Sequence, residues 1–278
     1  MKFIEYVDPD GMGRQFVVYN KILQFSKSYG LTPIFDFRKK CYFRNAQYEN
    51  QKVSKYFKFD NSLIHDTNEI DKIKDDEIFK ISRPNFEKYN VSESYSKLWY
   101  EYKSFNSTQK SKCFLDIVGF GLSEAKKQEY KTKVGIHLRL GNGEFTLNST
   151  RRTIKTKFLT EESLLHLFKN FFESNKRSIF VCSDTKSIIL KLKNSFGDLI
   201  SSFDRYYPKI GWGAGHNTNL IPRQHRDKID VYQSIYDAIY EMKLLGHTEQ
   251  VFHTGGNFNW IANNIYNLKC DLIDNLLK

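Results

Sequence analysis

The amino-acid sequence predicts an α/β protein in which two Rossmann-like domains in tandem face a cleft. The chain has 278 residues, more than a single hydrophobic core usually serves, which favours two domains. Apolar strand-like runs alternate with amphipathic helical segments in both halves. Each half also has a glycine-rich turn where a strand passes into a helix, as ligand-binding α/β domains do.

The first half opens with a β-α-β unit. A strand is expected over residues 3–7, a helix over 16–28 and a second strand over 32–36. The intervening turn, D-P-D-G-M-G-R-Q, holds Gly11 and Gly13. Glycines there let a ligand reach the exposed N–H groups of the helix, but they would equally serve a turn with no ligand.

The rest of the first half is less regular. Helices are expected around residues 68–80 and 92–102. A charged stretch at 126–133 precedes the next apolar strand, and we place the domain boundary there. The N-terminal domain is then expected to span residues 1–130, and the C-terminal domain residues 131–278.

The second half continues the alternation of strands and helices. The pattern predicts strands at 134–139, 178–182, 199–203 and 250–253, and helices at 161–174, 186–196, 230–245 and from 258 onward. A polar loop over 206–228 is longer than connections usually are, and that length suggests a function.

The stretch V-G-I-H-L-R-L-G-N-G-E at 134–144 is the most informative one. His137 and Arg139 leave the same face of the predicted strand, because strand side chains alternate with period two. A guanidinium can hold a phosphate with a planar fork of donors. The glycines that follow let the backbone approach a ligand, and Glu144 is a candidate proton acceptor. A His-x-Arg pair in a strand without any such role remains the alternative.

Further candidates follow other strands. Asp184 comes directly after an apolar strand, where it could touch a ligand or only cap the next helix. The turn T-G-G-N at 254–257 could cradle a phosphate at a helix start, or Asn257 could be only an N-cap. On the helix before it, Glu241 could read guanine if buried, but an exposed position is the ordinary expectation.

Composition restricts the partners. The net charge of +11 implies an acidic partner: a nucleic acid, an anionic membrane surface or a phosphorylated small molecule. The four cysteines lie far apart, so neither a zinc site nor a disulfide framework is indicated. No signal peptide or membrane span is evident. We expect a cytoplasmic protein and leave open a peripheral contact with the inner membrane face.

The motifs together resemble those of the α-1,6-fucosyltransferase group, glycosyltransferase family 23, especially the nodulation-factor fucosyltransferases. I-H-L-R-L-G-N-G-E is similar to the donor-site motif of that group. The other matches occur in the right order over nearly the whole chain: G-M-G-R-Q at 11–15, D-F-R-K-K-C-Y-F at 36–43, V-C-S-D-T at 181–185, and the segment from Glu241 to Phe258.

The resemblance implies a GT-B fold, with the acceptor mostly on the first domain and the nucleotide sugar on the second. It implies that Arg139 clamps the β-phosphate, His137 contacts the nucleotide and Glu241 reads guanine. Glu144 would be the base or part of its relay. The remaining donor-binding residues would be Asn142, Gly255, Gly256, Asn257 and Phe258. The acceptor-side residues would be Gly13, Arg14, Gln15, Asp36 and Asp184.

From this resemblance we expect an inverting glycosyltransferase that moves a sugar, expected to be fucose, from a GDP-sugar to a hydroxyl of a glycan or lipid-linked glycan in cell-surface polysaccharide biosynthesis. No metal or other cofactor and no nucleic acid is expected. Two alternatives stay open: a basic nucleic-acid-binding protein, although no basic stripe is visible, and a catalytically inactive nucleotide-sugar-binding relative. The sequence does not determine the oligomeric state.

Overall fold

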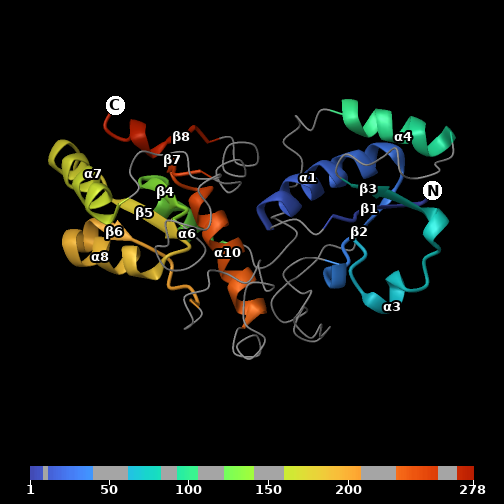
Figure 1. Cartoon of the computed structure of the whole chain (residues 1–278), viewed down its shortest axis with the longest axis horizontal. Helices are drawn as coiled ribbons and strands as arrows, with labels where there is room; N and C mark the ends of the chain where they lie inside the picture. The colour runs from blue at the N-terminus through green and yellow to red at the C-terminus, as the bar shows by residue number, and fades with distance from the viewer. Residues whose placement is uncertain are drawn as a thin grey trace. The chain divides into compact units, whose positions relative to one another are not determined.

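The structure, a computed structural model, describes residues 1–8, 12–39, 62–82, 93–105, 122–140, 160–207, 230–255 and 268–278. The chain divides into two compact units, Met1–Phe120 and Gly121–Lys278. Each unit is built around its own parallel β-sheet with helices (Figure 1). The predicted α/β class, with two Rossmann-like units in tandem, is confirmed.

The first unit has a three-stranded sheet in the order β2-β1-β3. Its strands are β1 (Phe3–Tyr6), β2 (Thr32–Ile34) and β3 (Ile78–Ile81), and both pairings are parallel. Helix α1 (Met12–Tyr29) connects β1 to β2, as predicted, although it begins four residues before the predicted start at 16. It buries Tyr19, whose hydroxyl donates a hydrogen bond of 2.7 Å to the carbonyl of Ile34 at the end of β2.

The remaining elements of this unit differ in part from the prediction. Helix α4 (Glu93–Ser104) is found where one is expected. The predicted helix over 68–80 is wrong: helix α3 (Thr67–Ile70) is one turn long, and a 3-10 turn η2 (Asp75–Glu77) leads straight into β3. A second short turn, η1 (Phe37–Lys39), follows β2. The segment I-F-K-I becomes a strand because three of its side chains are buried when it pairs with β1.

The second unit has a five-stranded, fully parallel sheet in the order β6-β5-β4-β7-β8. The strands are β4 (Val134–Leu138), β5 (Ile179–Ser183), β6 (Ile200–Ser201), β7 (Gln250–His253) and β8 (Cys270–Leu272). From β4 the chain adds strands in one direction through β5 to β6, and it then returns to add β7 and β8 on the other side of β4. The topological switch point of this Rossmann-type order therefore lies between β4 and β7.

Helices cover both faces of this sheet (Figure 1). Helices α7 (Glu161–Ser174) and α8 (Lys186–Phe196) share a core with the side chains on one face, including Ile136 of β4. Helices α6 (Glu124–Lys131) and α10 (Val231–Leu245) share a core with those on the other face. The described part of this unit also contains the turns η4 (Gly197–Leu199) and η6 (Ile273–Asn275).

Two elements of the second unit differ from the prediction. Strand β8 was not predicted, and neither was α6, which overlaps the charged stretch at 126–133 where the domain boundary was placed. Its start is fixed by Ser123, whose hydroxyl caps the amide of Lys126. Most of the predicted loop at 206–228 and the predicted start of the last helix at 258 lie outside the described residues. No helix in the described segments is long and apolar enough to cross a membrane.

Candidate functional site

The predicted His-x-Arg motif lies at the switch point of the second sheet. His137 of β4 and His253 of β7 are register partners near the carboxyl ends of their strands. Arg139 and Gly255 each follow two residues later. Open α/β sheets bind ligands outside the carboxyl ends of the strands at such a point. The structure therefore brings together two segments that are separated by more than a hundred residues in the sequence.

Thr254 fastens the ends of these two strands to each other. Its side chain is fully buried, and its hydroxyl accepts a hydrogen bond of 2.7 Å from the amide of Arg139 and donates one of 3.1 Å to the carbonyl of the same residue. Its own amide donates to the carbonyl of His137 at 3.1 Å. The main chain of Arg139 is therefore fixed at the switch point, while its side chain is only partly buried.

His137 is a buried imidazole at this edge. Burial lowers its pKa to about 3; Asp184 opposes this shift, and the nearby Arg139, His253 and Arg205 add to it. The ring is therefore neutral at physiological pH. It can contribute one hydrogen-bond donor and one acceptor to a ligand but no positive charge, so the cationic group of this motif is Arg139.

Asp184 follows β5 and lies beside the loop that leaves β4. Its carboxylate accepts a hydrogen bond of 3.0 Å from the amide of Leu140 and one of 3.3 Å from the hydroxyl of Thr185. Thr185 is the N-cap of α8 and makes no side-chain capping bond, so Asp184 does not act as the cap. Asp184 instead ties the start of α8 to the segment that carries Arg139.

Gly255 belongs to the predicted phosphate cradle at 254–257, of which Thr254 and Gly255 are described. Its φ is +131°, a backbone conformation that favours glycine. Gly256 and Asn257 of this cradle, and the predicted donor-binding residue Phe258, lie outside the described residues. So do Asn142 and the candidate base Glu144, whose roles stay predictions.

Glu241 corrects one expectation of the sequence analysis. A surface position was the ordinary expectation, but the residue is 3% exposed, because α10 packs this side against the sheet. One carboxylate oxygen, Oε2, accepts a hydrogen bond of 2.8 Å from Nη1 of Arg205. Burial raises the pKa of Glu241 to about 7; Arg205 opposes that rise and Asp237 adds to it.

Sequence reasoning did not single out Arg205. It lies four residues beyond β6, next to two tyrosines, in the segment F-D-R-Y-Y. Arg205 could have been found from its position: it lies beyond the end of β6, the strand next to β5, and Asp184 follows β5 at the same edge of the sheet. Its side chain is 6% exposed, which is unusual for a guanidinium without a function or an ion-pair partner.

The acceptor-side candidates of the first unit are held by local contacts. Gln15 is buried and donates a hydrogen bond of 2.8 Å to the carbonyl of Asp8, which links α1 to the residues after β1. Gly13 and Arg14 were predicted to lie in that turn, but they belong to the first turn of α1. Their contact with an acceptor stays a prediction.

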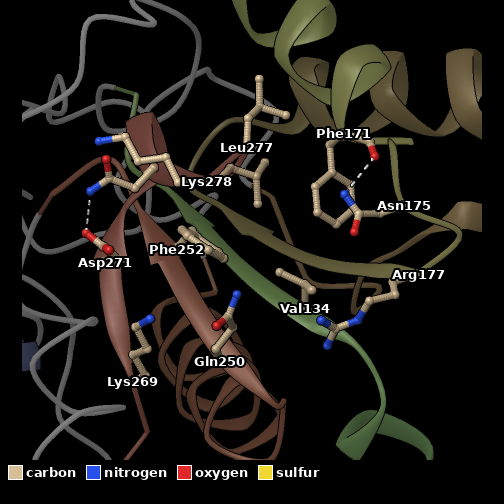
Figure 2. Close-up of a pocket in the computed structure, with 12 residues that line it drawn as sticks. Val134, Phe171, Asn175, Arg177, Gln250, Phe252, Lys269, Asp271, Leu277 and Lys278 are labelled. Atoms are coloured by element: carbon tan, nitrogen blue, oxygen red, sulfur yellow. Dashed lines mark hydrogen bonds between the residues drawn. The ribbon is translucent and has the colours of Figure 1, made fainter. Parts of the chain in front are cut away.

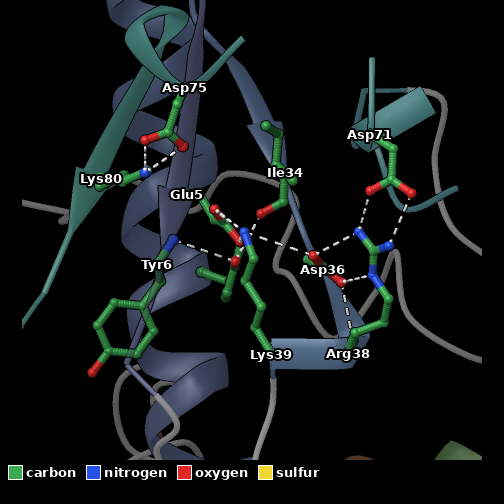
Figure 3. A network of polar contacts seen from close by, with 10 residues as sticks. Glu5, Tyr6, Ile34, Asp36, Arg38, Lys39, Asp71, Asp75 and Lys80 are labelled. Carbon is green, nitrogen blue, oxygen red and sulfur yellow. Dashed lines mark hydrogen bonds and ion pairs between the residues drawn. The ribbon is translucent and has the colours of Figure 1, made fainter. Parts of the chain in front are cut away.

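Asp36 is fully buried and belongs to the ion-pair network in Figure 3. Its carboxylate accepts hydrogen bonds from Nε and Nη2 of Arg38, at 2.9 and 3.0 Å, while Lys39 lies 3.7 Å away. Arg38 also contacts both oxygens of Asp71. The described contacts of Asp36 are therefore structural, and a role toward an acceptor stays a prediction.

A cavity of about 500 Å³ lies at the opposite, amino-terminal edge of the second sheet (Figure 2). Val134 and Gln250, the first residues of β4 and β7, line it together with Arg177, Lys269 and Asp271. None of the predicted site residues is among its lining residues. The described segments also contain no group of three His, Cys, Asp or Glu side chains that could hold a metal ion.

Comparison with known proteins gives structural likeness only. No protein-family model matches the sequence, and neither does any curated protein. Among solved structures, NodZ α-1,6-fucosyltransferase soaked with GDP-fucose has a TM-score of 0.47 at 11% identity, over 95% of this chain and 93% of that chain. NodZ from Bradyrhizobium has a TM-score of 0.47 at 12% identity, over 95% and 92%. Apo POFUT1 has a TM-score of 0.41 at 11% identity, over 98% and 97%.

Proposed function

We propose that this chain is a glycosyltransferase that uses a GDP-sugar, with the diphosphate bound at the carboxyl edge of the second sheet. The observation that carries the proposal is the place of Arg139 at the switch point between β4 and β7, with its main chain fixed by Thr254. A guanidinium there can grip a diphosphate with two parallel hydrogen bonds. The resemblance to family 23 is the reason for proposing guanine as the base of the donor and fucose as its sugar.

In this proposal the charge that develops on the leaving diphosphate is stabilised by the chain itself. Arg139 contributes the positive charge, and the neutral ring of His137 contributes a hydrogen bond. The main-chain N–H groups of the predicted cradle at 254–257 are proposed to bind the phosphates. Glu144 takes the proton of the acceptor hydroxyl, and attack from the opposite side of the sugar inverts the anomeric centre. The acceptor is a glycan or a lipid-linked glycan.

Recognition of the nucleobase is assigned to Glu241. Its Oε2 is engaged by Arg205, and among the described residues no donor reaches its other oxygen, Oε1. A carboxylate oxygen can accept the N–H donors along the Watson–Crick edge of guanine, whereas adenine presents an acceptor at the corresponding ring position. GDP is therefore expected to stabilise the protein more than ADP or UDP, which a thermal-shift screen measures.

The decisive variant is Arg139→Ala. Loss of a group that stabilises the transition state costs about 10² to 10³ in turnover, so activity with a GDP-sugar is expected to fall at least that far while the fold is kept. Arg177→Ala is the matched control, because Arg177 lies at the other edge of the same sheet and pairs with Glu249. Mass spectrometry of the products measures turnover, and circular dichroism checks folding. Near-normal activity of Arg139→Ala would refute the proposal.

The same assay tests metal independence. Turnover is expected to be unchanged in EDTA, because Arg139 and the turn at Gly255 are proposed to neutralise the leaving group. A requirement for added Mn²⁺ would contradict this mechanism.

A further inference from the structure

Arg205 and Glu241 form a buried ion pair at the carboxyl edge of the second sheet. The distance from Nη1 to Oε2 is 2.8 Å, and the two side chains are 6% and 3% exposed. The partners are 36 positions apart in the sequence, one beyond β6 and the other on α10. Burial of two charges is costly, so such a pair adds little net stability and raises the question of which specific role it has.

The other contacts of Arg205 hold its segment in place. Nη1 also lies 3.5 Å from the carbonyl of Ser183 at the end of β5, and the guanidinium lies 5.1 Å from the ring centre of Tyr207. The hydroxyl of Tyr207 donates to the same carbonyl at 3.1 Å. The amide of Tyr206 donates to Asp237 of α10 at 2.6 Å. Arg205 is therefore fixed between the end of β5 and α10.

The surroundings of Glu241 would otherwise favour its protonated form. Asp237 on α10 and Asp184 beyond β5 both disfavour a further negative charge, and Cys182 of β5 lies against its helix turn. Tyr207 faces the same pair, and the buried His137 of β4 is neutral. In the described part of the chain, Arg205 is the only cation that forms an ion pair with Glu241. A protonated carboxyl would donate a hydrogen bond from one oxygen instead of only accepting.

We propose that Arg205 is a positioning residue that orients the Glu241 side chain and favours its ionised form, so that Glu241 accepts hydrogen bonds from the base of a bound nucleoside diphosphate. The inference rests on the proposed function and adds to it the residue that sets base preference. The hydrogen bond from Arg205 to Glu241 is made by Nη1. The Nε atom of Arg205 is buried and has no hydrogen-bond partner in the described segments.

The inference is tested by a double-mutant cycle on nucleotide affinity. Calorimetry compares GDP with inosine diphosphate, which lacks the 2-amino donor, for the wild type, Arg205→Met, Glu241→Gln and the double variant. Arg205→Met is expected to weaken GDP binding by at least about tenfold near pH 7 and to abolish the preference for GDP over inosine diphosphate. In the Glu241→Gln background the same substitution is expected to have little further effect, because Arg205 acts through Glu241.

The pH dependence separates this role from a merely structural one. In Arg205→Met, GDP affinity is expected to recover as the pH rises and Glu241 ionises, whereas Arg205→Lys keeps the charge and is expected to retain the wild-type pH profile. Equal and additive losses in both backgrounds, or an unchanged pH profile, would overturn the inference and leave the proposed function standing. A wild type that binds no GDP would overturn both. If Arg205→Met does not fold, Arg205→Lys and the uncharged double variant provide the comparison.

Discussion

Gly135 sets the distance between strand β4 and the turn after α10. A Cβ atom at this position would lie 2.5 Å from Oγ1 of Thr248 and 2.8 Å from Cδ1 of Leu245. Thr248 cannot rotate away without loss, because its hydroxyl donates to the carbonyl of Leu245 at 2.7 Å. A glycine is therefore required for β4 to approach this turn, two residues before His137.

Gly135→Ala is expected to lower the free energy of unfolding by about 1 to 3 kcal/mol, the usual cost of overpacking a core. Urea denaturation measures it. Thr248→Ala removes the nearer of the clashing atoms, so the double variant is expected to lose less than the sum of the two single changes. An unchanged stability of Gly135→Ala would show that the turn after α10 can move away from β4.

Individual site residues were predictable to different degrees. His137 and Arg139 could be found because the alternation of a strand and the glycines that follow are local properties of the sequence. Burial of Glu241 could not be predicted, since α10 is amphipathic and the polarity of a residue does not say what packs against it. Arg205 was missed for the same reason: its partner lies on another element.

Among the elements, the end of β2 and the turn η1 are joined to β1 by one lysine (Figure 3). Lys39 lies 3.0 Å from Oε2 of the fully buried Glu5 in β1 and 3.7 Å from Asp36. In the described segments Lys39 is the only cation paired with Glu5. Its ammonium therefore compensates a carboxylate that has no access to water.

Lys39→Met is expected to destabilise the protein by roughly 2 kcal/mol, less than the loss of a fully buried partner costs, because Lys39 itself is 43% exposed. Denaturant unfolding near neutral pH measures the loss. The matched control is Lys2→Met, which breaks the exposed pair with Glu77 and is expected to have no measurable effect. Equal effects of the two changes would contradict the special position of Glu5.

The elements predicted correctly are those with long, regular patterns. Helices α7, α8 and α10 and strands β4, β5 and β7 agree with prediction because their apolar residues repeat with a clear period. The failures are short elements. Residues 68–80 contain scattered apolar residues that mimic a helix, but pairing with β1 makes 78–81 a strand. Strand β8 has only three residues, too few to show a period in the sequence.

Over the molecule as a whole, two buried groups respond to pH in opposite directions. Burial lowers the pKa of His137 from 6.5 to about 3. As the pH falls below 6.5, the unfolded chain binds a proton at this residue and the folded chain does not, so the free energy of unfolding decreases. Burial raises the pKa of Glu241 from 4.5 to about 7. Between these two values the folded chain holds a proton that the unfolded chain has released, so the free energy of unfolding decreases as the pH rises from 4.5 to 7. Between 4.5 and 6.5 the two effects oppose each other.

Glu241→Gln is therefore expected to make the free energy of unfolding fall more steeply as the pH is lowered across that window, because only the effect of His137 remains. In His137→Gln the free energy of unfolding is expected to rise as the pH is lowered across that window, because only the effect of Glu241 remains. Urea unfolding at a series of pH values measures both slopes. Slopes equal to that of the wild type in both variants would show that these groups titrate normally in the folded protein.

The pattern of apolar residues is enough to predict that this chain forms two α/β units and that Arg139 and His137 share one face of a strand. These follow from local periodicity, which does not depend on distant contacts. Three features of the site could be learned only from the folded chain: β4 and β7 are neighbours, Thr254 fixes Arg139, and Glu241 is buried against Arg205. Strand order and burial depend on contacts between residues far apart along the chain, and the same local pattern is compatible with several such arrangements.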